Sequence, residues 1–400
     1  MSRSGSDVRK SRATFAALLA AAALPAQQAP PPAPSDPPAA SSGPADPFRE
    51  AHARRVARET AALEAELAAV TAFGHDDEFA AALDAISGAI RGAGWWKTDD
   101  GMLPPSSIDH WLVWNRPQHG RKLPTAIDVE VEGHPYAAIV DLARQLDAHG
   151  IEFLFVCFPT RAQCYPEVVV PGLDTNPDPA SGRPPFRGIV EANTRFLLEL
   201  SKAGVEVVNL APVFVDHRID EADPKRRLLY LQSNVHWAPR GAELAAKTVA
   251  GRVAEQPWFK PGAYKEGRSF DITRREISFH GGGSAQAPDA PPEPLAMNRV
   301  KMRGPPLQRD AARHAPIVLL GDSFAWFHQD LQSSFWDHLF RYTGYAIDLI
   351  APAGGTEFSC RDALRRRGDG LRDKKLVIWL VQEAALLPSD EFVPIDLFPK

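Results

Sequence analysis

Residues 316–324 read PIVLLGDSF, a short apolar run between a proline and a glycine. A continuous apolar run of this length predicts a buried strand of a parallel sheet. The chain must turn sharply at the end of the strand, and Gly321 permits an unusual backbone conformation there. Ser323 follows at the carboxyl end of the strand, where ligands bind in open α/β sheets. Two interpretations are open for Ser323: the N-cap of the next helix, which serine favours, or a nucleophile.

The flanking sequence alternates between helical patterns and apolar strands. Apolar residues recur at helical spacing over 136–146, 189–200 and 238–253, and a further helical segment covers 362–367. Continuous apolar strands lie at 151–158, 205–210, 345–350 and 376–381. This alternation predicts an α/β fold with a doubly wound, mostly parallel sheet. After Ser323, the spacing of Phe324, Phe327 and Leu331 predicts an amphipathic segment.

Composition and charge narrow the class of protein. The 400 residues are 44% hydrophobic with a net charge of −5, which allows a large core and gives no reason to expect nucleic-acid binding. Cys157, Cys164 and Cys360 form no disulfide framework and lack zinc-site spacing, although a Cys157–Cys164 bridge stays open in an oxidising compartment. The Gly-rich turn after His280 lacks the spacing and the lysine of a phosphate loop. No metal or nucleotide motif is visible in the sequence, so we expect no metal and no cofactor.

The N-terminal part predicts an exported protein. Residues 1–26 have the layout of a secretory signal peptide, with basic residues, an apolar run and then small residues, although a disordered Ala-rich leader is the alternative. A Pro/Ala-rich linker follows at 27–47, then an N-terminal helical segment at 48–94 and the α/β domain at 95–400. The domain carries a Pro/Gly-rich insertion at about 256–315, whose composition favours a loose surface segment. No later stretch reaches transmembrane length.

A serine nucleophile needs a base, and His236 is the best placed of the 12 histidines. It lies in residues 231–242, LQSNVHWAPRGA, a loop just before the helical pattern of 238–253. An ordinary surface histidine is the alternative interpretation. The sequence therefore predicts a Ser323–His236 pair only if the fold brings these two segments together.

Taken together, the two motifs resemble a known family. Gly-Asp-Ser-Phe at 321–324, preceded by Asn-x-His-Trp at 234–237, resembles the SGNH-hydrolase-like domain of the alginate O-acetyltransferase family, in which Asp-x-His-Trp comes before Gly-Asp-Ser-Phe. The segments 158–161 and 165–167 and the last strand, 377–383, are also similar to that family. The resemblance covers roughly residues 80–390.

The resemblance implies serine-dependent acetyl transfer to an exopolysaccharide such as alginate in the periplasm. Ser323 would be the nucleophile and His236 the general base, with an acetyl donor, a polysaccharide acceptor and a membrane acyltransferase as candidate partners. Developing charge on the ester oxygen requires hydrogen-bond donors. The backbone N–H of Ser323 is one candidate, and Gly354, Gly355 and Thr356 are others. A simple strand-to-helix turn is the alternative for those three residues.

One position departs from the family pattern. Asn234 stands where the family has the aspartate that orients the histidine, and an amide cannot neutralise an imidazolium. Three interpretations remain open. The chain is a weakened or specialised transferase, an enzyme that recruits another carboxylate from Asp216, Asp220 or Asp223, or a non-catalytic relative that only binds polysaccharide.

Overall fold

The computed structural model describes residues 47–69, 133–169, 191–231, 234, 236–261, 269–279, 292–304, 313–352, 359–368, 371–386 and 392–398. The predicted signal peptide and nearly all of the predicted linker lie outside these residues, as do His280, Gly354, Gly355 and Thr356. In chain order the elements are α1 (Pro47–Ala69), α4 (Pro135–Ala148), β1 (Glu152–Phe158), α5 (Arg161–Cys164), α6 (Pro166–Val169), α7 (Glu191–Lys202), β2 (Glu206–Asn209), α8 (Ala211–His217), α9 (Pro239–Ala254), β3 (Ser269–Phe279), β4 (Glu293–Arg303), β5 (Ile317–Leu320), α11 (Ser323–Trp326), α12 (Phe335–Thr343), β6 (Ile347–Ile350), α13 (Ser359–Arg366), β7 (Leu376–Gln382) and the 3-10 turn η3 (Glu383–Ala385).

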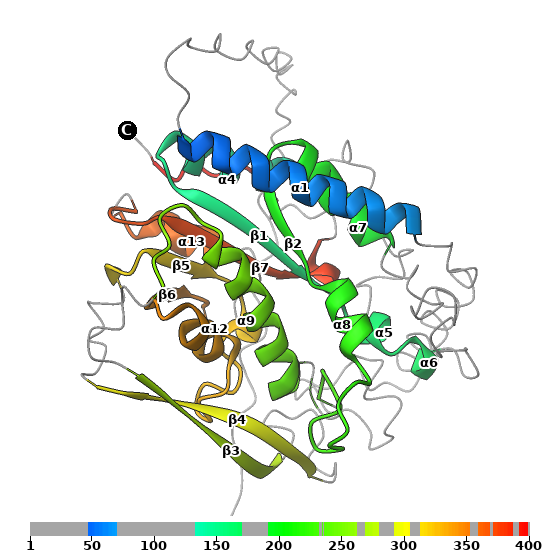
Figure 1. Cartoon of the computed structure of the whole chain (residues 1–400). Helices are drawn as coiled ribbons and strands as arrows, with labels where there is room; N and C mark the ends of the chain where they lie inside the picture. Colours follow the sequence, from blue (N-terminus) through cyan, green and yellow to red (C-terminus); the bar gives the residue numbers. More distant parts are fainter. Residues whose placement is uncertain are drawn as a thin grey trace, which may run out of the picture. The chain divides into compact units, whose positions relative to one another are not determined.

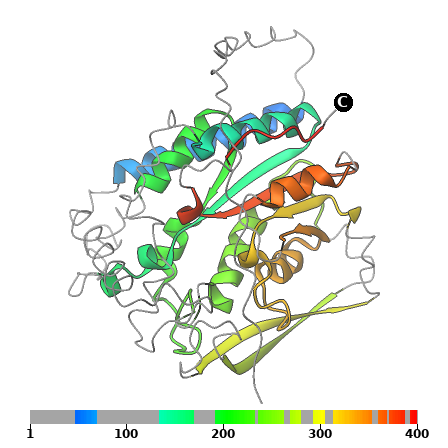
Figure 2. The ribbon, with the colours of Figure 1, turned by 180° about the vertical axis from the view of Figure 1, so that it is seen from behind.

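Five strands form one parallel sheet in the order β2-β1-β7-β5-β6 (Figure 1). The last strand of the chain, β7, lies between β1 and β5, so the carboxyl ends of β1 and β5 flank the end of β7. Helices cover both faces of this sheet (Figures 1 and 2). The predicted doubly wound, mostly parallel α/β fold is confirmed.

The two faces of the sheet bury separate apolar clusters. On β1, Leu154 and Val156 point into a cluster with residues of α8, α9 and α12. Phe155 and Cys157 point the other way, into a cluster with residues of α1, α4, α7 and α13. Because alternate residues of a strand face opposite sides, both sets must be apolar, which explains the continuous apolar runs in the sequence.

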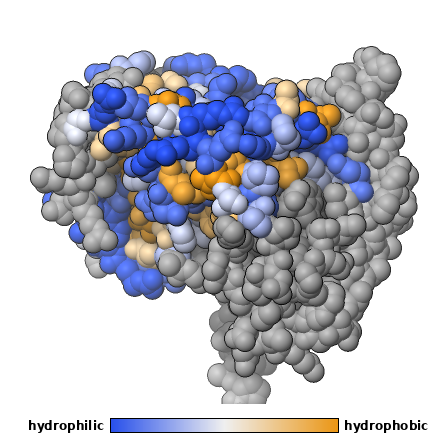
Figure 3. All heavy atoms as spheres, turned by 90° about the horizontal axis from the view of Figure 1, so that it is seen from below, coloured by the Kyte–Doolittle hydropathy of each residue, from blue (hydrophilic) through white to orange (hydrophobic). Residues whose placement is uncertain are grey.

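The insertion contains a paired ribbon, where its composition predicts a loose segment. Strands β3 and β4 pair antiparallel from Ser269–Arg303 to Phe279–Glu293, and β4 contacts α9 and α12. Most residues of β3 are exposed. Seen from below, the side on which the ribbon lies in Figure 1, the surface carries many hydrophilic side chains with apolar ones gathered among them (Figure 3). The ribbon therefore covers one side of the helices that follow the site motifs.

Several other sequence expectations can be compared with the described residues. Cys157, Cys164 and Cys360 are buried free thiols. In the stretch after residue 360, Arg361 and Lys374 are buried, and Lys374 Nζ lies 2.7 Å from the carboxylate of Asp348. None of the helices in the described part of the chain is both long and apolar enough to cross a membrane.

Candidate active site

Ser323 is the first residue of α11, directly beyond the carboxyl end of β5. Asp322 is the N-cap, and its carboxylate accepts a 2.7 Å hydrogen bond from the N–H of Phe324. The interpretation of Ser323 as the cap is therefore wrong, and its hydroxyl is free for another partner. Gly321 has no positive φ, unlike our expectation; a Cβ there would lie 3.3 Å from that of Ala325, so close packing explains the glycine.

The loop that carries His236 is fixed by backbone pairing and by a buried indole. Leu231 N–H donates to the carbonyl of His236 at 3.0 Å, and Ala238 N–H donates to that of Leu229 at 2.8 Å. Trp237 is fully buried and packs against the rings of Phe158, Phe324 and Phe335. These contacts anchor the loop over the edge of the sheet, so that His236 faces Ser323.

Asn234, His236 and Ser323 form a continuous hydrogen-bonded chain. His236 Nε2 lies 2.7 Å from Ser323 Oγ, and His236 Nδ1 lies 2.6 Å from Asn234 Oδ1. The same Oδ1 accepts a 3.2 Å bond from the backbone N–H of His236, which can only donate. The Asn234 oxygen therefore faces Nδ1, Nδ1 carries the proton, and Nε2 is left as an acceptor for the Ser323 hydroxyl. The amide thus holds the productive tautomer.

His236 is a neutral imidazole at rest. Burial, and secondarily the nearby His328, lowers the pKa of His236 to about 3. Burial also lowers the pKa of His328 to about 4, although its Nε2 donates to the carbonyl of Trp237 at 3.2 Å. Burial disfavours the charged form of a histidine, and among the described residues no carboxylate hydrogen-bonds His236, while Asp330 only partly offsets the effect of burial on His328. His236 is therefore unprotonated near neutral pH, and its affinity for a proton is weak.

The carboxylates considered as substitutes for the missing aspartate lie elsewhere. Asp220 pairs with His217 and Arg240, and Asp223 pairs with Arg274. Asp216 is exposed on α8. In the ranges that the structure describes, the partner of His236 Nδ1 is the amide of Asn234 and no carboxylate hydrogen-bonds the ring.

Arg161 holds the loop that carries His236 through hydrogen bonds to its backbone, a role that the sequence does not reveal. It begins α5 after the end of β1 and is buried, and its Nη1 donates to the carbonyls of Leu231 at 2.5 Å and Asn234 at 3.1 Å. Burial lowers the pKa of Arg161 to about 9. The signal that could have indicated it is its place directly after a buried strand, at the edge where the site forms.

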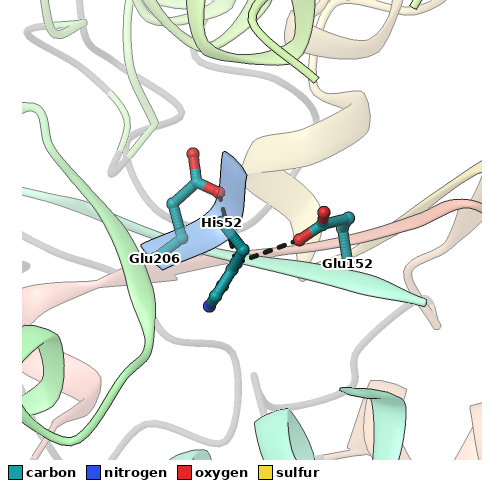
Figure 4. Close-up of side chains that lie close together, drawn as sticks. All are labelled: His52, Glu152 and Glu206. Atoms are coloured by element: carbon teal, nitrogen blue, oxygen red, sulfur yellow. Dashed lines mark hydrogen bonds and ion pairs between the residues drawn. The ribbon is translucent and has the colours of Figure 1, made fainter. Parts of the chain in front are cut away.

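A second cluster of titratable side chains, His52, Glu152 and Glu206, lies at the amino ends of β1 and β2 (Figure 4). His52 Nδ1 lies 3.0 Å from a Glu152 oxygen, and its Nε2 lies 3.0 Å from the carbonyl of Gly204. Both partners are acceptors, so the ring carries both protons, and the hydrogen bond to Glu152 raises the pKa of His52. Arg55 also pairs with both glutamates. An imidazolium has no lone pair for a metal, so this cluster is an ion-pair network that joins α1 to the sheet.

A cavity of about 370 Å³ adjoins this network. Its lining includes Phe48, His52, Glu152, Trp258 and Lys375 but neither Ser323 nor His236. It lies at the amino ends of the strands, whereas Ser323 lies at a carboxyl end. The cavity is therefore separate from the candidate active site.

A parallel α/β domain with a serine and a neutral histidine in hydrogen-bond contact at the carboxyl edge has the architecture of a serine hydrolase. Residues 130–383 match the family model described as "SGNH hydrolase-like domain, acetyltransferase AlgX". This match covers more than half of the chain, and the chain belongs to the alginate O-acetyltransferase family.

Individual relatives are more distant. The chain is 26% identical over 150 residues to the probable alginate O-acetylase AlgJ of Pseudomonas fluorescens, a match that covers 37% of this chain and 32% of that relative. It thus spans about a third of the length of this relative. The solved O-acetyltransferase domain of Pseudomonas putida AlgJ is 18% identical, with 63% of this chain and 81% of that chain covered and a TM-score of 0.44. The solved structure of Pseudomonas aeruginosa AlgX is 21% identical, with 62% of this chain and 56% of that chain covered and a TM-score of 0.45.

Proposed function

We propose that the chain is an exported O-acetyltransferase that transfers an acetyl group through Ser323 to a hydroxyl of an exopolysaccharide, with acetyl-ester hydrolysis as the same chemistry on water. The observation that carries the proposal is the hydrogen-bonded chain from Asn234 through His236 to Ser323. A nucleophile, a base and an orienting group in this order form the arrangement that activates a hydroxyl for acyl transfer.

The reaction runs in two balanced halves. Ser323 Oγ attacks the acetyl carbonyl while its proton passes to His236 Nε2, and the bond to the leaving oxygen then breaks as that oxygen takes the proton. The resulting acetyl-Ser323 ester is attacked by an acceptor hydroxyl, which gives its proton to Nε2. Collapse releases the acetylated acceptor and returns the proton to Ser323. Asn234 holds the proton on Nδ1 throughout, so that Nε2 is the nitrogen that takes up and returns the transferred proton.

The negative charge that develops on the carbonyl oxygen needs donors, each worth roughly 3–4 kcal/mol in related chemistry. Ser323 N–H is the first N–H of α11 and has no hydrogen-bond partner among the described residues. It is available for this oxygen in the proposal. Gly354, Gly355 and Thr356 remain predicted donors that lie outside the described residues.

The acceptor, the donor and the location follow from the family and the N-terminal sequence. An alginate-like polysaccharide would accept the acetyl group, a membrane acyltransferase is the candidate supplier, and the predicted leader at 1–26 would export the chain to the periplasm. A weakly active or purely polysaccharide-binding protein is the second candidate. The low pKa of His236 and the neutral Asn234 favour it, because a base with pKa about 3 accepts a proton poorly.

The test uses a chromogenic acetyl ester and a sulfonyl fluoride that labels activated serines. We expect Ser323→Ala to lose both turnover and labelling, and the matched control Ser278→Ala, at an exposed position of β3, to keep both. Equal turnover in the wild type and Ser323→Ala would exclude Ser323 as the nucleophile. An unlabelled, inactive wild type that still retains polysaccharide on an affinity column would establish the binding protein instead.

A further inference from the structure

The imidazole of His236 has a third neighbour that the sequence motifs do not include. The ring of Phe327 stacks on it, with ring centroids 3.7 Å apart and planes within 5°. Phe327 N–H donates to the carbonyl of Ser323 at 2.8 Å, so the two residues lie one helical turn apart. Side chains four residues apart share a face of a helix, so one short turn presents both the nucleophile and an aromatic face to the same histidine.

Phe327 is held from its other side by the ribbon and by its own neighbour. The ring of Phe279 on β3 meets it edge-on at 6.2 Å, and the ring of His328 does so at 4.5 Å. Phe327 also packs against the small apolar cluster that contains Leu231 and Leu295. A ring fixed by contacts from β3, β4 and the His236 loop cannot rotate freely, so its face is a permanent part of the surroundings of His236.

The charges around His236 leave its protonated form poorly supported. Its Nδ1 partner is a neutral amide, and the nearby His328, whose neutral form is favoured, offers no negative charge. The carboxylate of Asp322 accepts from a backbone N–H of α11. Behind the loop lies the guanidinium of Arg161, whose charge is favoured by Glu293 at the start of β4. No described carboxylate contacts the ring, so the imidazolium that forms during proton transfer needs another source of stabilisation.

An aromatic face can supply it. The π face of a phenyl ring carries partial negative charge and attracts a cation within about 6 Å of its centroid, for roughly 0.5–2 kcal/mol. The 3.7 Å stack lies well inside that limit. We propose that Phe327 is a positioning residue that fixes the plane of the His236 imidazole and stabilises its protonated form, in partial replacement of the carboxylate that Asn234 lacks. The kinetic part of this inference rests on the function proposed above.

The first experiment changes the charge of the ring without changing its packing. Phenylalanine with one, two or three ring fluorines is incorporated at 327, and kcat is measured with the acetyl ester. Each fluorine withdraws charge from the π face, so we expect kcat to fall stepwise, by roughly 2- to 30-fold over the series. The control is the same series at Phe270, another residue of β3, whose ring packs on that of Phe340 in α12. A flat series at 327, or an equal fall at 270, would overturn the inference.

The second experiment reads His236 directly and does not depend on activity. In the Asn234→Asp protein, imidazole NMR signals of His236 are titrated with and without Phe327→Leu. We expect loss of the aromatic face to lower the pKa of His236. The titration would show this as a roughly 2- to 30-fold increase in the acid dissociation constant of His236. An unchanged constant would refute the role of Phe327 even in an inactive protein. Turnover that survives Ser323→Ala would instead refute the proposed function alone.

Discussion

Replacing Asn234 by Asp restores a carboxylate where this chain has an amide. The substitution is nearly isosteric, and the oxygen that accepts from His236 Nδ1 at 2.6 Å and from the backbone N–H of His236 at 3.2 Å keeps both donors. Arg161, whose Nη1 lies 3.1 Å from the carbonyl of residue 234, places a positive charge close to the new carboxylate. The loop geometry should therefore survive, so that the experiment changes charge and little else.

The size of the effect follows from Coulomb's law. A carboxylate about 4 Å from the centre of the imidazolium stabilises it by roughly 4 kcal/mol at an effective dielectric constant near 20. At about 1.36 kcal/mol per pKa unit, this raises the pKa of His236 from about 3 to about 6. If the whole of this energy is available in the transition state, kcat rises by at most about 10³. This ceiling is below the roughly 10⁴ that the reverse change costs a serine protease.

The assay is kcat for a chromogenic acetyl ester between pH 3 and pH 9. A general base acts only when unprotonated, so the wild type should keep its activity down to about pH 4, because the pKa of His236 is about 3. Asn234→Asp should be faster at pH 7 and above but lose activity as the pH falls through about 6. Asn234→Ala, which removes the acceptor, should be slower than the wild type. An unmoved acid limb together with unchanged kcat in Asn234→Asp would refute the electrostatic reasoning.

Three further predictions concern the packing and the charges that support the fold and the site. Gly241→Ala should destabilise the protein by more than about 2 kcal/mol in urea unfolding, because its Cβ would lie 2.2 Å from a backbone oxygen. The control is Gly251→Ala on the same helix, where a Cβ would meet nothing within 4 Å, and this change should stabilise the protein by about 0.5–1 kcal/mol. His338 is fully buried with its pKa lowered to about 4 by burial, so it stabilises the fold above about pH 6.5 and loses that contribution as the pH falls toward 4. His338→Gln should therefore flatten the acid-unfolding curve by about 3 kcal/mol over that interval. Arg161→Met should lower both stability and kcat, because two buried carbonyls lose a charged donor worth about 1.5–3 kcal/mol per bond. Arg161→Lys should retain part of the stability and part of kcat. Equal losses in the Met and Lys variants would contradict a role through these hydrogen bonds.

The sheet was predictable because its information is local. A strand buried on both faces must be apolar at every position, so β5 and β7 stand out in the sequence without knowledge of their partners. The ribbon of β3 and β4 was missed because it lacks the continuous apolar run of a buried strand. β3 is mostly exposed, with charged residues in its middle, and it is defined by its pairing with β4. Pairing of this kind is a property of the fold rather than of either segment.

The site was predictable as far as its motifs reach. Ser323 and His236 lie in recognisable segments, and the parallel topology brings their elements to one edge. Phe327 looked like one more apolar residue of an amphipathic segment. Phe327 is instead the C-cap of α11, with its ring against the imidazole, and the left-handed His328 and Gln332 show that the predicted amphipathic segment is interrupted after it. Spacing alone cannot show a break of that kind.

The same residue type has opposite proton affinities at the two ends of this sheet, and the surroundings explain both. At the amino ends, His52 faces a carboxylate and a carbonyl, so its protonated form is favoured; its contribution to stability is complete below about pH 6.5 and is lost as the pH rises through its raised pKa. At the carboxyl ends, His236 and His328 are buried away from water and neither hydrogen-bonds a described carboxylate, so burial favours their neutral forms and acid destabilises the fold through them. The charged network around His52 thus joins α1 to the sheet. At the other end of the sheet, His236 stays neutral, and its Nε2 can accept a proton from the Ser323 hydroxyl that it contacts.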